Sequence, residues 1–327
     1  MLIKGLLNLA SPSGRRGRLS ILIFHRVFKD PDPVFPQEMH ARRFDALCGW
    51  LKAWFNVLPL DQAAIQLKAG TLPARAASIT FDDGYADNHD VAMPILRRHG
   101  LVSTFFVATG FLDGGRMWND TVIEAIRLTR LTTLELGDLG SYPVGTPQEK
   151  YQAIKAILDK LKYLPTAQRA SMTELVAESA EVVPPCDIMM TSMQVKALRQ
   201  AGMQVGAHTV SHPILATLGD ELARSEISDS KKHLESLTGE RVGLFAYPNG
   251  KPVQDYSDRT VQLVRELGFD LAVSTAWGAA RGSDTDIFQL PRFTPWDLSA
   301  NRFALRMAHN TRRVGDRVSP GAMEGQR

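Results

Sequence analysis

The sequence has few cysteines, since only Cys48 and Cys186 occur in 327 residues. Neither lies in a spacing typical of metal ligands, so the sequence excludes a zinc site built from cysteine thiolates. Cys48 falls within a helical apolar pattern and is interpreted as a small buried hydrophobic residue. Nothing in this cysteine content requires an oxidising compartment.

An excess of one charge is also missing. The 38 Lys and Arg residues nearly balance the 35 Asp and Glu residues, which leaves a formal net charge of +3. The nearest candidate for a basic cluster, Arg15, Arg16 and Arg18, is too short to indicate nucleic-acid binding. With 44% hydrophobic and 22% charged residues, the composition is that of an ordinary globular protein. The length allows a sizeable core without disulfides or a structural metal.

Long apolar runs are absent, because no window approaches the roughly 18 apolar residues of a membrane span. The apolar stretch at 2–9 is interrupted by Lys4, Gly5 and Asn8, and the arginines follow it, unlike in a secretory signal. We therefore expect a cytoplasmic protein. Residues 1–18 form an N-terminal extension, interpreted either as a frayed helix or as a peripheral contact with an anionic inner-membrane surface.

What the sequence does contain is a regular alternation of apolar, strand-like runs and helical patterns. Continuous apolar strands separated by helices indicate a parallel sheet covered on both faces. The number of units predicts an α/β fold, a (β/α) barrel of about seven strands, in which functional side chains gather at the carboxyl ends of the strands. The expected strands include 19–25, 78–83, 103–112, 203–209, 242–248, 271–275 and 287–293, and the expected helices 38–55, 61–69, 90–100, 192–201, 220–237, 257–267 and 300–309.

Residues 113–190 interrupt this alternation. They are mostly helical, at 119–130, 147–162 and 166–179, and they hold no expected barrel strand. Because they follow the carboxyl end of a strand, we expect an insertion on the active-site side of a barrel that spans 19–311. The polar, glycine-bearing tail at 312–327 is predicted to be disordered.

The segment TFDDGY (80–85) places two adjacent carboxylates and a glycine at the end of a buried strand. Two carboxylates this close resist ionising together unless a cation lies beside them. A metal on one would leave the other free as a general base. The alternative is a strand followed by an ordinary Asp-Gly turn.

The segment GAHTVSHP (206–213) places His208 and His212 four residues apart at the end of another apolar strand. Pro213 disfavours helical geometry at His212, so the pair lies in a loop at a strand end. Two imidazoles and one carboxylate make a three-ligand site with open positions, which is typical of a catalytic divalent metal. The alternative is two unrelated loop histidines.

Together with FAYPNG (245–250), these two segments resemble the motifs of the polysaccharide deacetylase family, the carbohydrate esterase family 4 group with NodB homology. The resemblance covers about 19–112 and 190–295, and the first two motifs carry most of it. It implies a distorted (β/α) barrel and a hydrolase that removes N-acetyl groups from a sugar, a polysaccharide or a polysaccharide precursor, as in exopolysaccharide biosynthesis.

The resemblance also implies roles for individual residues. Asp82 matches the general base that activates the attacking water, whereas Asp83, His208 and His212 match the ligands of a divalent metal. Zinc is expected for two histidines and a carboxylate, and cobalt, nickel, iron or manganese suits the same ligands. A backbone N–H in the third motif, here that of Asn249, is expected to bind the oxyanion.

This chain departs from the family pattern in two places. The family's third motif usually carries an arginine that orients the base, where this chain has Ala246. We expect Arg292, in the late strand, to pair with Asp82 instead, although a surface arginine at a strand end is the alternative. The family's late Leu-x-His acid motif is absent. His25 ends the first strand, so we expect it at the same mouth as an acid or a substrate contact.

Aromatic side chains are further candidates for contact with a carbohydrate substrate. Tyr247 and Trp296 are assigned to the substrate site, and Trp118 in the insertion is another ring that could stack on a sugar. The alternative for each tryptophan is simple burial.

Other functions remain compatible with the motifs. One alternative is an O-deacetylase or deformylase of a lipid-linked sugar, and another is a catalytically inactive carbohydrate-binding barrel. A phosphoesterase uses similar ligands but usually needs a second metal. The lack of a recognisable secretion signal favours a precursor made at the cytoplasmic face. The sequence carries no signal for an oligomeric state.

Overall fold

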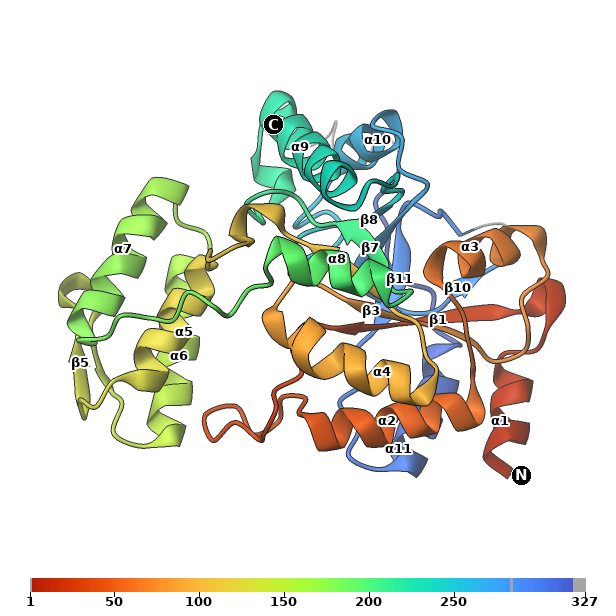
Figure 1. The fold of residues 1–327 in the computed structure, drawn as a ribbon, viewed down its shortest axis with the longest axis horizontal. Helices are drawn as coiled ribbons and strands as arrows, with labels where there is room; N and C mark the ends of the chain where they lie inside the picture. Colours follow the sequence, from red (N-terminus) through yellow and green to blue (C-terminus); the bar gives the residue numbers. More distant parts are fainter. Residues whose placement is uncertain (1, 283–284, 320–327) are drawn as a thin grey trace.

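The computed structural model describes residues 2–282 and 285–319, and within them seven parallel strands close into a barrel (Figure 1). The closed order is β1-β11-β9-β8-β7-β4-β3, with β3 paired back to β1. This confirms the predicted (β/α) barrel. The strands are β1 (Arg18–Phe24), β3 (Ala76–Phe81), β4 (Thr104–Val107), β7 (Gln204–Ala207), β8 (Leu244–Ala246), β9 (Leu271–Trp277) and β11 (Leu290–Phe293).

The barrel is distorted at two junctions. The register between β11 and β9 shifts between Leu290 and Arg292, and β7 meets β8 through the pair Ala207 and Phe245. Two short strands lie outside the closed ring. β2 (Asn56–Val57) runs parallel to the start of β3, and β10 (Ala280–Arg281) runs antiparallel to the start of β1.

Strand alternation separates an apolar barrel interior from an apolar outer layer. Buried side chains such as Ile21, Phe106 and Val273 share one cluster, whereas Phe81 and Phe245 belong to a second cluster with residues of the surrounding helices. Because successive side chains of a strand point to opposite faces, each strand supplies both layers. Toward the carboxyl ends of the strands the interior turns polar, and there Arg292 reaches Thr80 and Asp82.

Helices cover the outside of the barrel (Figure 1). Two of them, α8 (Ser192–Gln200) and α10 (Asp258–Glu266), begin at capping boxes formed by Thr191 and Ser257, which satisfy orphan N–H groups of the first turn. The helices around the barrel are α2 (Ala41–Trp54), α3 (Leu60–Ala69), α4 (Met93–His99), α8 (Ser192–Gln200), α9 (Asp220–Thr238), α10 (Asp258–Glu266) and α11 (Ala300–Asn310).

The N-terminal helix α1 (Leu2–Ala10) packs against α11 rather than fraying. Leu7 is 2% exposed and belongs to the main core, whereas Leu6 and Leu9 remain exposed. No helix among the described residues combines the length and the apolarity that crossing a membrane requires. A peripheral membrane contact through Leu6 and Leu9 stays a prediction.

The insertion forms a separate group of elements to one side of the barrel (Figure 1). Its helices α5 (Trp118–Leu128), α6 (Pro147–Leu161) and α7 (Thr166–Ser179) lie where the sequence predicts them, and they share an apolar core of their own. A hairpin of β5 (Thr133–Glu135) and β6 (Ser141–Pro143) was not predicted, because three-residue strands carry too short a pattern.

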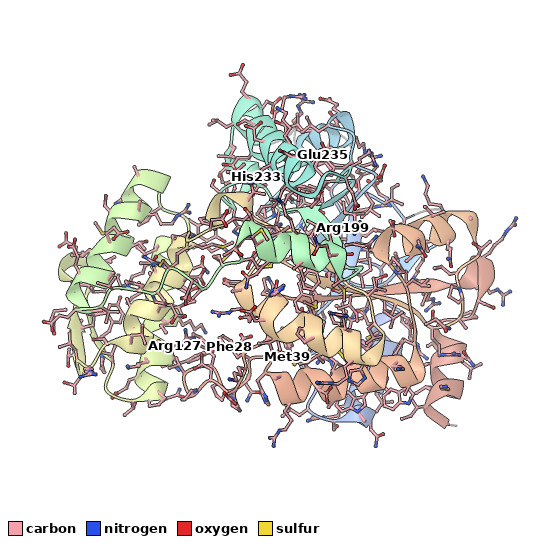
Figure 2. The ribbon with its side chains drawn as sticks, viewed as in Figure 1. Phe28, Met39, Arg127, Arg199, His233 and Glu235 are labelled. Atoms are coloured by element: carbon pink, nitrogen blue, oxygen red, sulfur yellow. The ribbon has the colours of Figure 1, made fainter. Side chains whose placement is uncertain are left out.

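The loop after β1 connects the barrel to this insertion. Figure 2 shows Arg127 of α5 beside Phe28 of that loop, and its guanidinium carbon lies 5.8 Å from the ring centroid. Arg127 also pairs with Asp32 at 2.6 Å, and Val34 is buried in the insertion's core. The loop therefore holds the insertion against the carboxyl end of the barrel.

The tail predicted to be disordered lies partly outside the described residues, which end at 319. In its described part, Val318 is buried, and its N–H donates to the side-chain oxygen of Gln289 over 2.8 Å. This part of the tail therefore packs on the barrel, which differs from the expectation.

Candidate active site

Three side chains from two strand ends meet at the mouth of the barrel. Asp83 follows β3, and His208 and His212 follow β7. Asp83 Oδ1 lies 3.3 Å from His208 Nε2 and 3.4 Å from His212 Nε2. All three potential ligand atoms lie within 4.8 Å of one another. The structure thus brings together the three residues that the sequence analysis assigned to a metal.

Backbone conformation explains how both aspartates reach one site. Asp82 continues the alternation of β3, and its N–H donates to Phe24 O over 2.9 Å. Asp83 adopts φ +76° and Gly84 adopts φ +90°, both in the left-handed region. That region favours glycine and tolerates aspartate better than most residues. The turn redirects the Asp83 side chain, which an extended strand would point away from Asp82.

Gly84 is expected to be intolerant of a side chain. Besides its positive φ, a Cβ at this position would lie 3.1 Å from Val107 Cγ1. We expect Gly84→Ala to lower the free energy of unfolding by about 1–3 kcal/mol, measured by urea denaturation. Gly219→Ala is a suitable control, because Gly219 has φ −67° and open space around its Cβ position. Equal stability of the two variants would contradict this account.

The second loop is held by a carboxylate that the sequence analysis did not single out. Glu226 of α9 accepts hydrogen bonds from the N–H groups of Val210 and Ser211 at 2.9 and 2.8 Å, and from the Ser211 hydroxyl at 2.6 Å. Thr209 Oγ1 accepts from the His212 N–H at 3.1 Å. These bonds fix the loop that presents His212. No local pattern marks Glu226, because its partners lie on a different element.

Glu226→Ala is expected to weaken metal binding by about 10-fold or more, because supporting hydrogen bonds of this kind orient the ligands. Zinc titration of the metal-free protein measures the change. Glu221→Ala, an exposed residue on the same helix, is the matched control and should leave the affinity unchanged. An unchanged metal affinity in the Glu226 variant would show that the loop holds His212 in place without the hydrogen bonds of Glu226.

The three side chains suit a divalent metal ion. His208 Nδ1 donates to the carbonyl oxygen of Ala246 at 2.7 Å, so the Nε2 lone pair faces Asp83 Oδ1. That oxygen is buried and has no hydrogen-bond partner among the described residues. Burial lowers the pKa of His212 to about 4, which keeps its imidazole neutral at pH 7. Lone pairs that converge without a donor between them fit a cation with open coordination positions.

The electrostatics of the cluster agree with that fit. Burial lowers the pKa of His208, but the nearby carboxylates of Asp83 and Asp82 and the hydrogen bond to Ala246 O raise it by more. Burial also opposes ionisation of Asp83, yet its histidine partners hold the pKa of that carboxyl well below its ordinary value. A positive charge between the carboxylate and the imidazoles is therefore favoured, and a divalent ion supplies it.

Asp82 is paired with Arg292 inside the barrel. Arg292 Nη1 donates to Asp82 Oδ1 and Nη2 to Asp82 Oδ2, each at 2.7 Å. Arg292 is 0% exposed and Asp82 is 2% exposed, and Arg292 Nε also donates to Ser274 O at 2.8 Å. Burial alone would raise the pKa of Asp82, but the arginine charge and its hydrogen bonds bring the pKa below the ordinary value. The base candidate is thus held ionised.

A cavity of about 420 Å³ lies over these groups, between the barrel mouth and the insertion. Its barrel wall includes the metal-ligand candidates, Asp82, His25, Asn249 and Thr275, and its other wall includes Trp118, Asp120, Ile123, Leu158, Lys162 and Arg169. His25 is exposed at this site, and Asn249 adopts φ +58°. The structure therefore places His25 and Asn249 on the same cavity as the metal-ligand candidates.

Comparison with known proteins places the chain in a family. The sequence model described as polysaccharide deacetylase matches residues 69–130 and 143–272, which is more than half of the chain. This protein belongs to the polysaccharide deacetylase family. Asp82, Asp83, His208 and His212, which carry the resemblance in the first two motifs, lie together on the cavity at the barrel mouth.

Individual relatives of this deacetylase-family protein are distant. The Bacillus subtilis (strain 168) polysaccharide deacetylase homologue YxkH is 22% identical over 277 residues, which cover 84% of this chain and 70% of the relative. The Streptococcus pyogenes deacetylase PplD, solved in complex with acetate, matches with a TM-score of 0.60 and 21% identity over 89% of this chain and 99% of its own. A de-N-acetylase from Aggregatibacter actinomycetemcomitans matches with a TM-score of 0.58 and 17% identity over 88% and 99%. The structural likenesses show a shared fold.

Two residues assigned to the substrate site lie elsewhere in this deacetylase-family protein. Tyr247 is fully buried outside the barrel ring, where its hydroxyl donates to Phe288 O at 3.0 Å and its ring stacks on Tyr256. Because the preceding Ala246 belongs to the interior cluster, alternation turns Tyr247 outward. Trp296 is 58% exposed and packs beside Trp277, where the chain runs from β11 toward α11. Neither residue lines the cavity.

Trp118, by contrast, lines the cavity at the start of α5. Its ring lies 5.1 Å from the guanidinium carbon of Arg169 on α7. Sequence patterns alone do not distinguish Trp118 from Trp296 as a substrate contact, because the difference depends on where the insertion folds back.

Proposed function

We propose that this protein is a metal-dependent hydrolase that removes N-acetyl groups from a sugar, a polysaccharide or a polysaccharide precursor. Asp83, His208 and His212 hold the divalent metal, with zinc as the expected ion, and Asp82 is the general base. The observation that carries the proposal is the meeting of the three ligand candidates with a separate, arginine-paired carboxylate in one cavity.

In the proposed chemistry the metal ion and the side chains have different roles. When bound, the metal supplies positive charge that polarises the acyl group and acidifies water. Asp82, held ionised by Arg292, accepts a proton from the attacking water. Both Asp82 oxygens bind Arg292, which fixes the plane of the carboxylate, and each oxygen keeps a second lone pair for the water's proton.

The remaining groups on the cavity are proposed to bind the substrate. The backbone N–H of Asn249 is offered as the donor to the oxyanion, a role that does not depend on the side chain. His25 at the exposed rim is offered as a contact to the sugar. Trp118 is the ring best placed for the apolar face of a sugar, because it lines the same cavity.

The test is acetate release from N-acetylglucosamine oligomers, with the products identified by mass spectrometry. We expect release by the zinc-loaded protein, loss after chelation, and recovery when zinc or cobalt is restored. Acetate from O-acetylated but not N-acetylated glycans would assign an O-deacetylase. A de-N-acetylase has the same fold, and for that reason we favour the N-acetyl substrate.

Two other outcomes would replace the proposal. Release of phosphate from a phosphomonoester, without acetate from any glycan, would assign a phosphoesterase. Glycan binding without turnover by the metal-loaded protein would assign an inactive carbohydrate-binding barrel. We disfavour that function, because a binding module has no need for a buried, ionised carboxylate beside a metal site.

A further inference from the structure

Asp120 is a buried carboxyl group on the cavity wall that the chemistry above does not use. It lies in the first turn of α5, at the start of the insertion, and lines the same cavity as Asp82 and Asp83. It is 2% exposed. The insertion thus contributes an acidic group to the cavity, across from the residues that the barrel supplies.

Hydrogen bonding engages only one oxygen of this carboxyl group. The Tyr85 hydroxyl donates to Asp120 Oδ1 at 3.0 Å, and Asn119 Nδ2 lies 3.4 Å from the same atom. Asp120 Oδ2 is buried and has no partner in the part of the chain that the structure describes. Burying an ionised carboxylate oxygen without a hydrogen-bond donor costs free energy. Protonation of the carboxyl group reduces this cost, because it removes the charge.

Burial favours the neutral form of Asp120. Burial raises the pKa of Asp120 to about 7 and the Glu124 carboxylate adds to the rise, whereas Arg26 and the hydrogen bond from Tyr85 oppose it. Arg26 itself pairs with Asp87 at 2.8 Å, so its charge is shared. Asp120 therefore differs from Asp82, which Arg292 keeps ionised. When the surroundings of two carboxyl groups lower the pKa of one and raise the pKa of the other, the first is suited to act as a base and the second as an acid in the same reaction.

We propose that Asp120 is the general acid that protonates the leaving nitrogen of the substrate, an inference that rests on the proposed deacetylase function. Water attacks the acyl carbon while Asp82 takes one of its protons. The carbon–nitrogen bond then breaks, its electron pair stays on nitrogen, and the Asp120 proton moves to that nitrogen. The products are a free amine and acetic acid, which loses its proton to solvent as acetate. Exchange with solvent returns a proton to Asp120 and removes one from Asp82.

This assignment leaves His25 with substrate binding. His25 was the acid candidate from the sequence, because the family's late acid motif is absent. In the structure its side chain is exposed at the cavity, in contact with solvent. Asp120 is enclosed, which prevents its proton from being lost to water before the bond breaks. The insertion would then complete a catalytic set that the barrel alone leaves unfinished.

The experiment compares leaving groups with different needs for a proton. An amine leaving group must be protonated, whereas the phenolate released from 4-nitrophenyl acetate departs without help. We expect Asp120→Asn in the zinc-loaded protein to lower deacetylation of N-acetylglucosamine oligomers by about 10²–10⁴-fold. Hydrolysis of 4-nitrophenyl acetate should stay close to the wild-type rate, which also shows that the variant folds and keeps its metal site.

Matched variants separate this role from its alternatives. Asp138→Asn makes the same chemical change at an exposed position of the insertion that does not line this cavity, and it should affect neither substrate. An equal loss on both substrates in Asp120→Asn would overturn the proposal in favour of a structural role. Selective loss in His25→Asn, with Asp120→Asn unaffected, would move the role to His25. If the wild type cleaves neither substrate, the proposed function itself fails.

Discussion

The Asp82→Asn variant is expected to keep its divalent metal and to lose deacetylation by about 10²–10⁴-fold, the usual contribution of a general base. An amide has the shape of the carboxylate but no basic lone pair for the water's proton. The metal should stay, because the ligand cluster consists of Asp83, His208 and His212. Steady-state rates on N-acetylglucosamine oligomers and elemental analysis after dialysis measure the two quantities.

The two aspartates are adjacent in sequence, so the result must distinguish them. A fully active Asp82→Asn variant would remove Asp82 as the base. A variant that loses its metal would instead exchange the roles given to Asp82 and Asp83. Asp83→Asn is the matched comparison and should bind metal weakly, because it replaces a charged ligand by a neutral amide.

Arg292→Met is expected to cause the largest loss of stability. The substitution leaves Asp82 buried without its partner, and breaking a buried ion pair in this way typically costs about 3–5 kcal/mol. The variant should also lose activity, because Arg292 alone among the described residues binds both oxygens of Asp82. Urea denaturation measures the change in the free energy of unfolding.

A surface pair and a double variant complete this test. Arg241→Met removes one partner of the exposed pair with Asp270, and exposed pairs contribute at most about 1 kcal/mol. Asp82→Asn combined with Arg292→Met should recover part of the stability without activity, because no isolated charge remains buried. If Arg292→Met lowers the free energy of unfolding by no more than Arg241→Met, the buried pair of Arg292 and Asp82 does not stabilise the barrel.

The barrel and its metal-ligand candidates could be predicted because local patterns mark them. Continuous apolar runs identified the strands, and polar residues directly after two of those runs identified Asp83 and His208. Parallel strands bring their carboxyl ends to one mouth, so sequence position alone places such residues near one another. The left-handed conformation of Asp83 was not predicted in detail, yet the Asp-Gly pair is typical of such a turn.

Residues whose partners lie far along the chain could not be found in the same way. Glu226 and Asp120 sit in ordinary helical patterns, and only the fold brings them to the histidine loop and to Tyr85. Tyr247 is a different case, because strict alternation from Ala246 already predicts an outward side chain. Membership of a motif does not by itself place a residue in the site, because neighbouring residues of a strand lie on opposite faces.

The separate apolar core of the insertion has an evolutionary consequence. Its buried residues pack largely among themselves, joined by a few from the loop after β1, while the metal-ligand candidates and the Asp82–Arg292 pair belong to the barrel. Replacements at wall positions such as Leu158 or Lys162 can therefore accumulate without disturbing the ligands or the base. Such a division lets a lineage acquire new glycan preferences while its chemistry is inherited intact, and it offers protein engineers a region to diversify.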